Sequence, residues 1–226
     1  YKGIVLKGEN FTRSPLQITQ KIFDNFIKNG GYFIKSKIES IHRIDDSLFL
    51  KYNTKEQQFN KIVIAAGVWS NILARSIGDH FPLDTERGYH ITFENKNNLL
   101  SHPVGWAKSG FYLTPMKDGI RAAGTVEIAG LKKQMNKNIL DTIEATSRSI
   151  LPKLGKVKSK WMGFRSTLPD SLPVIGESQK CRNVYYAFGH QHLGLSLAAI
   201  TGKVVLSLIE NKTNNIDINP LNPYRF

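Results

Sequence analysis

Cysteine is almost absent from this sequence, because Cys181 is the only one among 226 residues. An internal disulfide framework is therefore excluded, and a reducing compartment is favoured. There is also no run of roughly 18 or more apolar residues, so no transmembrane helix is predicted. The motifs G-x-S-x-G and H-E-x-x-H and the P-loop lysine pattern do not occur. Their absence argues against the common serine hydrolases, zinc proteases and P-loop nucleotide hydrolases.

Acidic residues are few relative to basic ones: 18 Asp and Glu against 31 Lys and Arg give a formal net charge of +13. A charge of this size is compatible with binding to nucleic acid or to an anionic membrane. The basic residues are scattered, however, and the sequence has no zinc-finger, helix-turn-helix or aromatic RNA-binding pattern. We therefore expect no nucleic-acid function, whereas a peripheral membrane contact stays open.

The chain reads as an α/β unit interrupted by a sheet-rich insertion. Ser14-Pro15-Leu16-Gln17 resembles a capping box, and the apolar spacing after it predicts a helix that ends at Gly30-Gly31. The run FNKIVIAA, residues 59–66, predicts a strand buried on both faces, and a helix is expected over residues 69–77. Residues 32–34, 38–44 and 48–52 are expected to be extended.

From Pro82 onward the pattern changes to antiparallel strands joined by turns such as Lys117-Asp118-Gly119. The last third returns to α/β character with a strand at residues 184–188 and a helix over residues 195–210. The proline-punctuated tail is expected to lie extended on the surface. The further expected elements are strands at residues 88–94, 105–115, 120–129 and 156–164 and a helix over residues 137–151.

Two strand-to-helix turns carry small residues where a ligand can approach the backbone. Ala65, Ala66 and Gly67 lie where the first of these strands ends, and Trp69 follows after Val68. In dinucleotide-binding folds, ligands bind outside the carboxyl ends of parallel strands. A tight connection that needs small residues explains the same pattern, and it is the simpler reading of this turn taken alone.

The second turn, residues 189–196, reads GHQHLGLS and opens the last helix. The first amide groups of a helix have no partner within it, so such a start binds anions or an electron-rich ring edge. This interpretation assigns ligand contacts to six residues: Gly189, His190, Leu193, Gly194, Leu195 and Ser196. A metal site at His190 and His192 is not expected, because no third ligand has suitable spacing.

Arg165 follows an aromatic residue and precedes the turn Pro169-Asp170-Ser171-Leu172-Pro173. A guanidinium group suits the binding of a carboxylate in a partly dry pocket. A structural ion pair with Asp170 is the alternative. Tyr89 and His90 begin a strand of the insertion, where they face either a substrate or the core.

Together these segments resemble the D-amino-acid dehydrogenase and D-amino-acid oxidase-like (DAO) family of FAD-dependent oxidoreductases. IVIAAGVWSNILA is similar to the family's second cofactor strand, and ERGYHITF and AAGTVEIAG are similar to its substrate domain. GFRSTLPDSLPVIG resembles its arginine-proline motif, with Ser166 where proline is usual. GHQHLGLSLAAITGKVVLSLI resembles its C-terminal flavin helix, and NPYRF its usual ending. The resemblance covers essentially the whole chain.

The resemblance implies a partial FAD-binding Rossmann-like domain with an antiparallel-sheet substrate domain inserted into it. Its expected divisions are residues 1–82 and 163–226 for the FAD-binding domain and 83–162 for the substrate domain. It implies oxidation of an amine-bearing carbon beside a carboxylate by hydride transfer to flavin. Arg165 would bind the substrate carboxylate, and Tyr89 and His90 would shape the pocket. Ala65, Ala66, Gly67 and Trp69 would line the adenosine side of FAD, and residues 189–196 would contact the flavin.

The resemblance also implies a cytoplasmic protein, free or peripheral to the inner membrane, with quinone and oxygen as alternative electron acceptors. No residue is assigned as a catalytic acid or base, and no metal is expected. No two glycines lie two positions apart, so the family's G-x-G-x-x-G unit is missing. We therefore expect the C-terminal part of an enzyme. The alternative is an inactive fragment, or a subunit that needs an N-terminal partner chain for pyrophosphate binding.

Overall fold

The computed structural model describes residues 10–95 and 98–226, so the first nine residues of the predicted domain 1–82 lie outside it. Two compact units share the chain. The first unit comprises Tyr1–Phe33, Gly88–Val126 and Gln134–Gly163, and the second comprises Ile34–Arg87, Glu127–Lys133 and Phe164–Phe226. The chain passes between them inside three strands, β5 (Asp84–Phe93), β8 (Gly119–Ile128) and β9 (Val157–Thr167).

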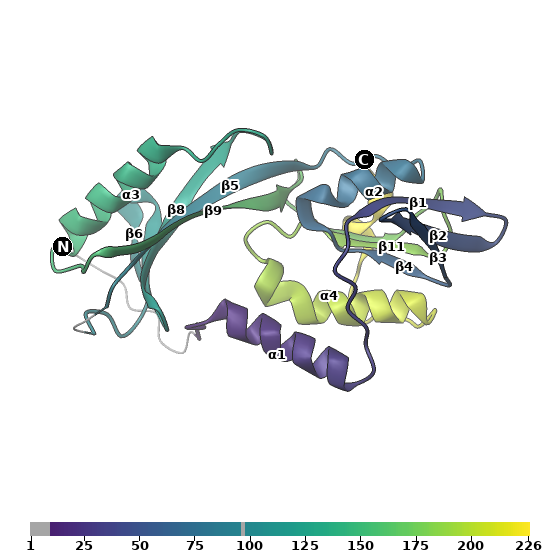
Figure 1. The fold of residues 1–226 in the computed structure, drawn as a ribbon, viewed down its shortest axis with the longest axis horizontal. Coiled ribbons are helices and arrows are strands. Elements are labelled where there is room, and N and C mark those ends of the chain that lie inside the picture. Colours follow the sequence, from purple (N-terminus) through teal and green to yellow (C-terminus); the bar gives the residue numbers. More distant parts are fainter. Residues whose placement is uncertain (1–9, 96–97) are drawn as a thin grey trace. The chain divides into compact units, whose positions relative to one another are not determined.

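The second unit is layered around a three-stranded sheet of order β10-β11-β4 (Figure 1). Strand β11 (Val184–Phe188) pairs parallel with β4 (Ile62–Ile64) and antiparallel with β10 (Val174–Glu177). Alternation along β11 sends Val184, Tyr186 and Phe188 into one core and Tyr185 into another. Helix α4 (Gly194–Ile209) packs against Tyr185, whereas α2 (Ser70–Ser76) and the β1-β2-β3 sheet pack on the opposite face.

That second sheet is an antiparallel meander of β1 (Ile38–Ile44), β2 (Ser47–Tyr52) and β3 (Lys55–Phe59). Ile41 and Leu48 are buried against the parallel strands. Short 3-10 turns complete the unit at η1 (Gly67–Trp69), η3 (Asn219–Leu221) and η4 (Pro223–Arg225).

The first unit holds the greater part of a five-stranded sheet of order β6-β7-β8-β5-β9. Helix α3 (Lys137–Ile150) covers one face of it, burying Leu140 and Ile143 against strand residues such as Ile91 and Leu113 (Figure 1). The remaining elements are α1 (Pro15–Lys28), β6 (Val104–Trp106), η2 (Ala107–Ser109) and β7 (Phe111–Met116).

The mixed α/β class and most elements are confirmed, but several strand predictions are wrong. Residues 32–34 are not a strand, and the expected strand 59–66 is two elements, β3 and β4. Val63 in β4 is 43% exposed, so burial of this run on both faces was wrong. Residues 105–115 are interrupted by η2, and β10 was not predicted.

The tail does not lie extended on the surface. It forms η3 and η4, buries Pro223, and its Tyr224 hydroxyl donates to the Glu177 carbonyl. Cys181 is buried, and burial raises the pKa of its thiol, so it is an ordinary core thiol. No helix in the described ranges is long and apolar enough to cross a membrane.

Candidate functional site

The carboxyl ends of the parallel strands β4 and β11 lie side by side in the second unit. Ile64, the last residue of β4, pairs with Tyr186. Beyond this pair, Ala65 follows β4, and β11 ends at Phe188. Ala65 is exposed, and a Cβ built on Gly67 would meet no atom within 4 Å. The backbone here is therefore open on the side where ligands of parallel sheets bind.

Helix α4 begins close to the end of β11 and without a side-chain cap. Leu193 occupies the N-cap position and contributes no side-chain hydrogen bond. Leu195 and Ser196 are exposed, so the start of this 16-residue helix is accessible to a ligand. Uncapped amides at the positive end of a helix dipole suit a negatively charged or electron-rich ligand.

The turn between β11 and α4 is tied to its surroundings through both histidines. The His190 Nε2 atom lies 2.9 Å from the Thr201 hydroxyl, and burial lowers the pKa of His190. The His192 Nε2 atom lies 3.5 Å from the Glu86 carboxylate. The two imidazoles therefore have different partners. The described residues contain no cluster of three or more metal-binding side chains.

Arg165 lies on β9 with a partly buried side chain. Its Nη1 atom is buried and has no hydrogen-bond partner among the residues that the structure describes. Burial lowers the pKa of Arg165, and the nearby negative charge of Glu86 counteracts this effect. A buried guanidinium nitrogen without an acceptor suits a carboxylate ligand.

The alternative reading of Arg165, an ion pair with Asp170, is wrong. Asp170 instead pairs with Arg225, whose Nε lies 2.5 Å from a carboxylate oxygen. That hydrogen bond lowers the pKa of Asp170. Asp170 therefore fastens the C-terminal tail and leaves Arg165 available.

Aromatic contacts connect the turn after β4 with the arginine strand. The Trp69 ring meets the Phe164 ring edge-on at a centroid distance of 6.0 Å. The buried Arg87 guanidinium lies over the same Phe164 ring, 5.6 Å from its centroid. Trp69 is 50% exposed, so it retains surface for a ligand. Thus the predicted cofactor-binding residues and Arg165 all lie in the second unit.

Tyr89 and His90 belong to the first unit. Tyr89 is 1% exposed, and its hydroxyl accepts a hydrogen bond from the Asn136 backbone N–H. His90 is partly exposed and stacks on Trp161 at 4.7 Å between ring centroids. Burial, with a further contribution from Arg121, lowers the pKa of His90 to about 4. Of this pair, His90 is the residue with accessible surface.

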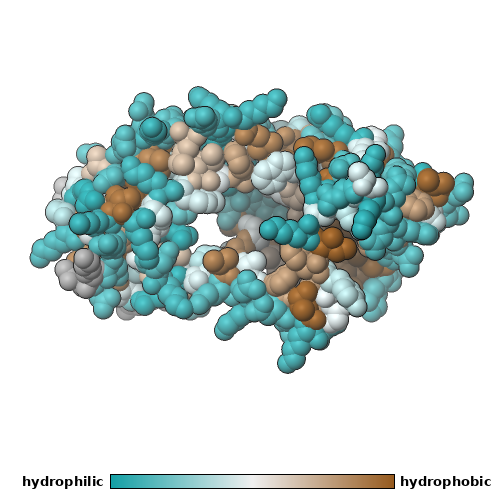
Figure 2. All heavy atoms as spheres, viewed as in Figure 1, coloured by the Kyte–Doolittle hydropathy of each residue, from teal (hydrophilic) through white to brown (hydrophobic). Residues whose placement is uncertain are grey.

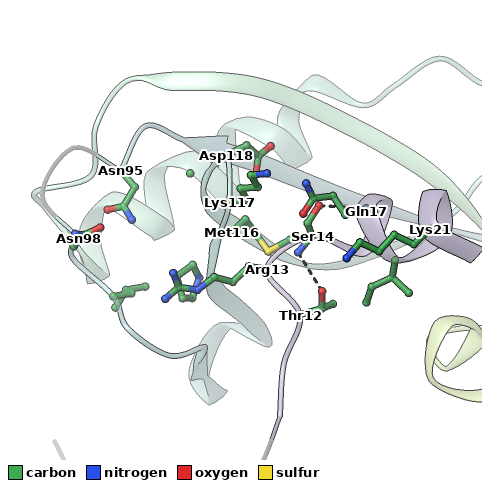
Figure 3. A pocket seen from close by; sticks show the side chains of 14 residues that line it. Thr12, Arg13, Ser14, Gln17, Lys21, Asn95, Asn98, Met116, Lys117 and Asp118 are labelled. Carbon is green, nitrogen blue, oxygen red and sulfur yellow. Dashed lines mark hydrogen bonds between the residues drawn. The ribbon is translucent and has the colours of Figure 1, made fainter.

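A cavity of about 650 Å³ lies in the first unit, between the start of α1 and the β7–β8 turn (Figure 3). The Lys117 backbone N–H donates to the Arg13 carbonyl at its base. Its lining is largely polar and exposed, including Arg13, Lys21 and Asp118. It contains none of the residues predicted to bind substrate or cofactor.

Comparison with known proteins places these features in a family. A family model described as FAD dependent oxidoreductase (DAO) matches residues 1–208. The chain belongs to this FAD-dependent oxidoreductase family. It is 32% identical over 231 aligned positions to a D-amino-acid oxidase of Bradyrhizobium diazoefficiens, covering 99% of the chain and 55% of that protein. It is 29% identical over 167 positions to a glycine oxidase of Pseudomonas putida, covering 73% of the chain and 45% of the relative.

The family member described here spans about half the length of these curated relatives. Among solved structures, an L-proline dehydrogenase from P. horikoshii has a TM-score of 0.82 at 20% identity, covering 94% of this chain and 59% of that one. A glycine oxidase from Geobacillus kaustophilus has a TM-score of 0.78 at 21% identity, covering 86% and 53%. These likenesses confirm the flavoenzyme fold.

The residues of the second unit fit FAD, the cofactor of the family. Their fit rests on the uncapped start of α4, the open space in front of Gly67 and the exposed ring of Trp69. Gly189 has φ +84, a conformation that favours glycine, and its Cβ would collide with Leu168. Sequence reasoning did not assign Glu86 or Ser166 to this site.

Proposed function

We propose that this chain forms the part of an FAD-dependent amino-acid oxidase or dehydrogenase that binds the substrate carboxylate and the flavin end of the cofactor. The buried Nη1 atom of Arg165, which has no partner in the described residues, carries this proposal. Arg165 shares its unit with the uncapped α4 start and with the small residues after β4. An anion-binding side chain and a cofactor-binding edge are thus built by one compact unit.

Each part of the site has a distinct task in this proposal. Arg165 binds the substrate carboxylate and so orients the neighbouring amine-bearing carbon. The N–H groups of Leu195 and Ser196 stabilise negative charge at the cofactor ring. Ala65 and Gly67 admit the cofactor close to the backbone. Bound FAD supplies a two-electron acceptor for the hydrogen that leaves the substrate carbon with its electron pair.

We further propose that the pyrophosphate of FAD is bound by a glycine-rich segment that is not part of these 226 residues. The relatives are about twice as long, and β4 is an edge strand paired only with β11 among the described strands. An edge strand presents unpaired N–H and C=O groups, which suit pairing with a further strand.

Apolar side chains with exposed fractions from 38% to 57% lie on β4, α2 and α4. Patches of hydrophobic residues interrupt the hydrophilic surface in Figure 2. The exposed large apolar residues on these three elements are Val63, Ile72, Leu195, Ile200 and Leu206.

Titration of the chain with FAD, followed by flavin fluorescence and visible absorption, tests cofactor binding directly. The same titration is repeated after co-expression with the part of the Bradyrhizobium relative that this chain does not match. Tighter FAD binding in the complex supports the proposal that the pyrophosphate is bound by a segment outside these 226 residues. Absence of flavin from both samples contradicts the proposed function.

Anaerobic reduction of the flavin by amino acids then tests the chemistry. D-Alanine, other D-amino acids, glycine, sarcosine and cyclic imino acids form the panel, and L-alanine is the stereochemical control. Bleaching of the flavin followed by release of the matching 2-oxo acid, or of a cyclic imine from a cyclic imino acid, supports the proposal. Re-oxidation by oxygen or by a soluble quinone identifies the electron acceptor.

The net charge of +13 supports the proposal that the protein binds, permanently or reversibly, to the inner face of an anionic membrane. Sedimentation with anionic vesicles at low and high salt tests it. Recovery with anionic vesicles at low salt that is no higher than recovery with neutral vesicles would contradict this electrostatic membrane contact.

A further inference from the structure

The turn Gly189–Leu193 is fastened to two neighbouring strands. The Gly189 N–H donates to the Ser166 hydroxyl over 3.2 Å, and the Gln191 N–H donates to the Ser166 carbonyl over 3.2 Å. On β5, the Glu86 carboxylate lies 3.5 Å from His192 Nε2. One side chain on each strand therefore reaches the turn.

The backbone of this turn needs such support. Gly189 has φ +84 and Gln191 has φ +48, which places a non-glycine residue in the left-handed region. Such conformations persist where the surroundings hold them. The Ser166 hydroxyl and carbonyl hold the N–H groups of these same two residues.

Both anchors are also neighbours of Arg165. Ser166 follows it in β9, and the negative charge of Glu86 acts on its guanidinium. Strands β5 and β9 are adjacent in the sheet. The contacts that shape the turn before α4 are thus made by residues that flank the proposed substrate-binding arginine.

We propose that Ser166 and Glu86 are positioning residues that fix the turn 189–193, and with it the start of α4, relative to Arg165. This inference rests on the proposed function, in which Arg165 places the substrate and the start of α4 contacts the flavin. Transfer of hydrogen requires reacting atoms to approach within about 3–3.5 Å, and a displacement of about 1 Å costs roughly a hundredfold in rate. Anchoring of the turn thus keeps the start of α4 at a fixed distance and orientation from Arg165.

The first experiment measures amide hydrogen exchange by NMR in the full chain and requires no cofactor. Ser166→Ala removes the acceptor of the Gly189 N–H, and we expect this amide to exchange about tenfold faster. Ser166→Thr retains a hydroxyl and should restore protection. Ser47→Ala is the control, because Ser47 Oγ likewise accepts a hydrogen bond, from Gln58 Nε2, on another sheet.

The Glu86 anchor is tested in the same way with Glu86→Gln, which keeps the shape and removes the charge. We expect faster exchange at Gln191 and His192. A matched control exists in Glu56→Gln, because the Glu56 carboxylate lies 3.7 Å from His42 Nε2 on the β1–β3 sheet. Unchanged exchange in the turn in both Ser166→Ala and Glu86→Gln would overturn the anchoring.

The second experiment uses the FAD-loaded protein. Ser166→Ala and Glu86→Gln should lower the limiting rate of flavin reduction about tenfold or more while substrate KM changes less, because Arg165 is retained. Equal rates in variants and wild type would overturn the positioning role. A wild-type protein that takes up no FAD contradicts the proposed function instead, and the exchange data then decide the anchoring on their own.

Discussion

The guanidinium of Arg87 is fully buried and lies 3.6 Å from the carboxylate of Glu127, across the neighbouring strands β5 and β8. Its Nε also donates to the Gly130 carbonyl over 2.7 Å. The same group faces the ring of Phe164, the residue before Arg165. This buried charge pair therefore joins β5 and β8 beside Phe164 of β9, the strand that carries Arg165.

Glu127→Ala should destabilise the second unit by about 3–5 kcal/mol, because it leaves a buried positive charge without its carboxylate. Lys133→Ala is the matched control. Lys133 Nζ lies 3.9 Å from the same carboxylate, but its side chain is 66% exposed, so its loss should cost less than about 1 kcal/mol. Urea unfolding measures both. Equal midpoints for the two variants would contradict a structural role of the buried pair.

Asp79 is an acceptor shared by the hydroxyl groups of two buried residues in the second unit. Ser178 Oγ and Tyr186 Oη donate to the same carboxylate oxygen over 2.5 and 2.6 Å. Asp79→Ala leaves both donors without an acceptor, so the free energy of unfolding should fall by about 1–3 kcal/mol for each donor. Tyr186→Phe removes one donor and leaves the Ser178 bond, so it should cost about 1 kcal/mol. Thermal unfolding orders the two variants, and a larger loss for Tyr186→Phe would refute this account.

Local signals in the sequence predicted most helices, because caps and apolar spacing act within a few residues. Ser14 accepts the Gln17 N–H as its motif predicts, and α1 ends at Lys28, before the glycine pair. Helix α1 nevertheless has no buried residue, although its apolar side chains recur at helical spacing. Periodicity indicates which face is apolar, but what covers that face depends on tertiary structure.

The strand errors have the same origin. FNKIVIAA is expected to be one strand, yet polar Asn60 and Lys61 separate its ends, which lie in different sheets: β3 pairs with β2, and β4 pairs with β11. Pairing between distant segments leaves no local mark in a single sequence. The contacts of Glu86 with His192 and of Ser166 with Gly189 also join residues far apart in the chain. Residue types alone therefore suggested Arg165 and the glycine turn, but not the residues that anchor them.

Arg165→Lys should raise the KM of an amino-acid substrate roughly ten- to a hundredfold with a smaller change in kcat. A lysine retains the charge but lacks the two-pronged guanidinium geometry that matches a carboxylate. The control is Arg75→Lys, because Arg75 contacts His80 at the surface and its loss should leave KM unchanged. Steady-state kinetics of the FAD-loaded protein provide the measurement. An unaltered KM in Arg165→Lys would remove this residue from the substrate site.

The stability of the fold should fall on acidification between about pH 6.5 and pH 4 because of His90. Burial, with Arg121 contributing further, lowers the pKa of His90 from 6.5 to about 4. In this window the unfolded chain binds a proton at His90 that the folded chain does not. Stability therefore rises with pH across the window, by at most about 1.4 kcal/mol per pH unit for one proton.

His90→Phe removes the titrating group and keeps a ring that can stack on Trp161, so its unfolding free energy should depend less on pH between 4 and 6.5. Urea unfolding at several pH values compares it with the wild type, and contributions from carboxylates are common to both. Histidine NMR provides an independent reading, in which the His90 signals stay in the neutral form down to about pH 5. A midpoint near 6.5 would show that His90 is solvated rather than buried, and the difference in pH dependence would then disappear.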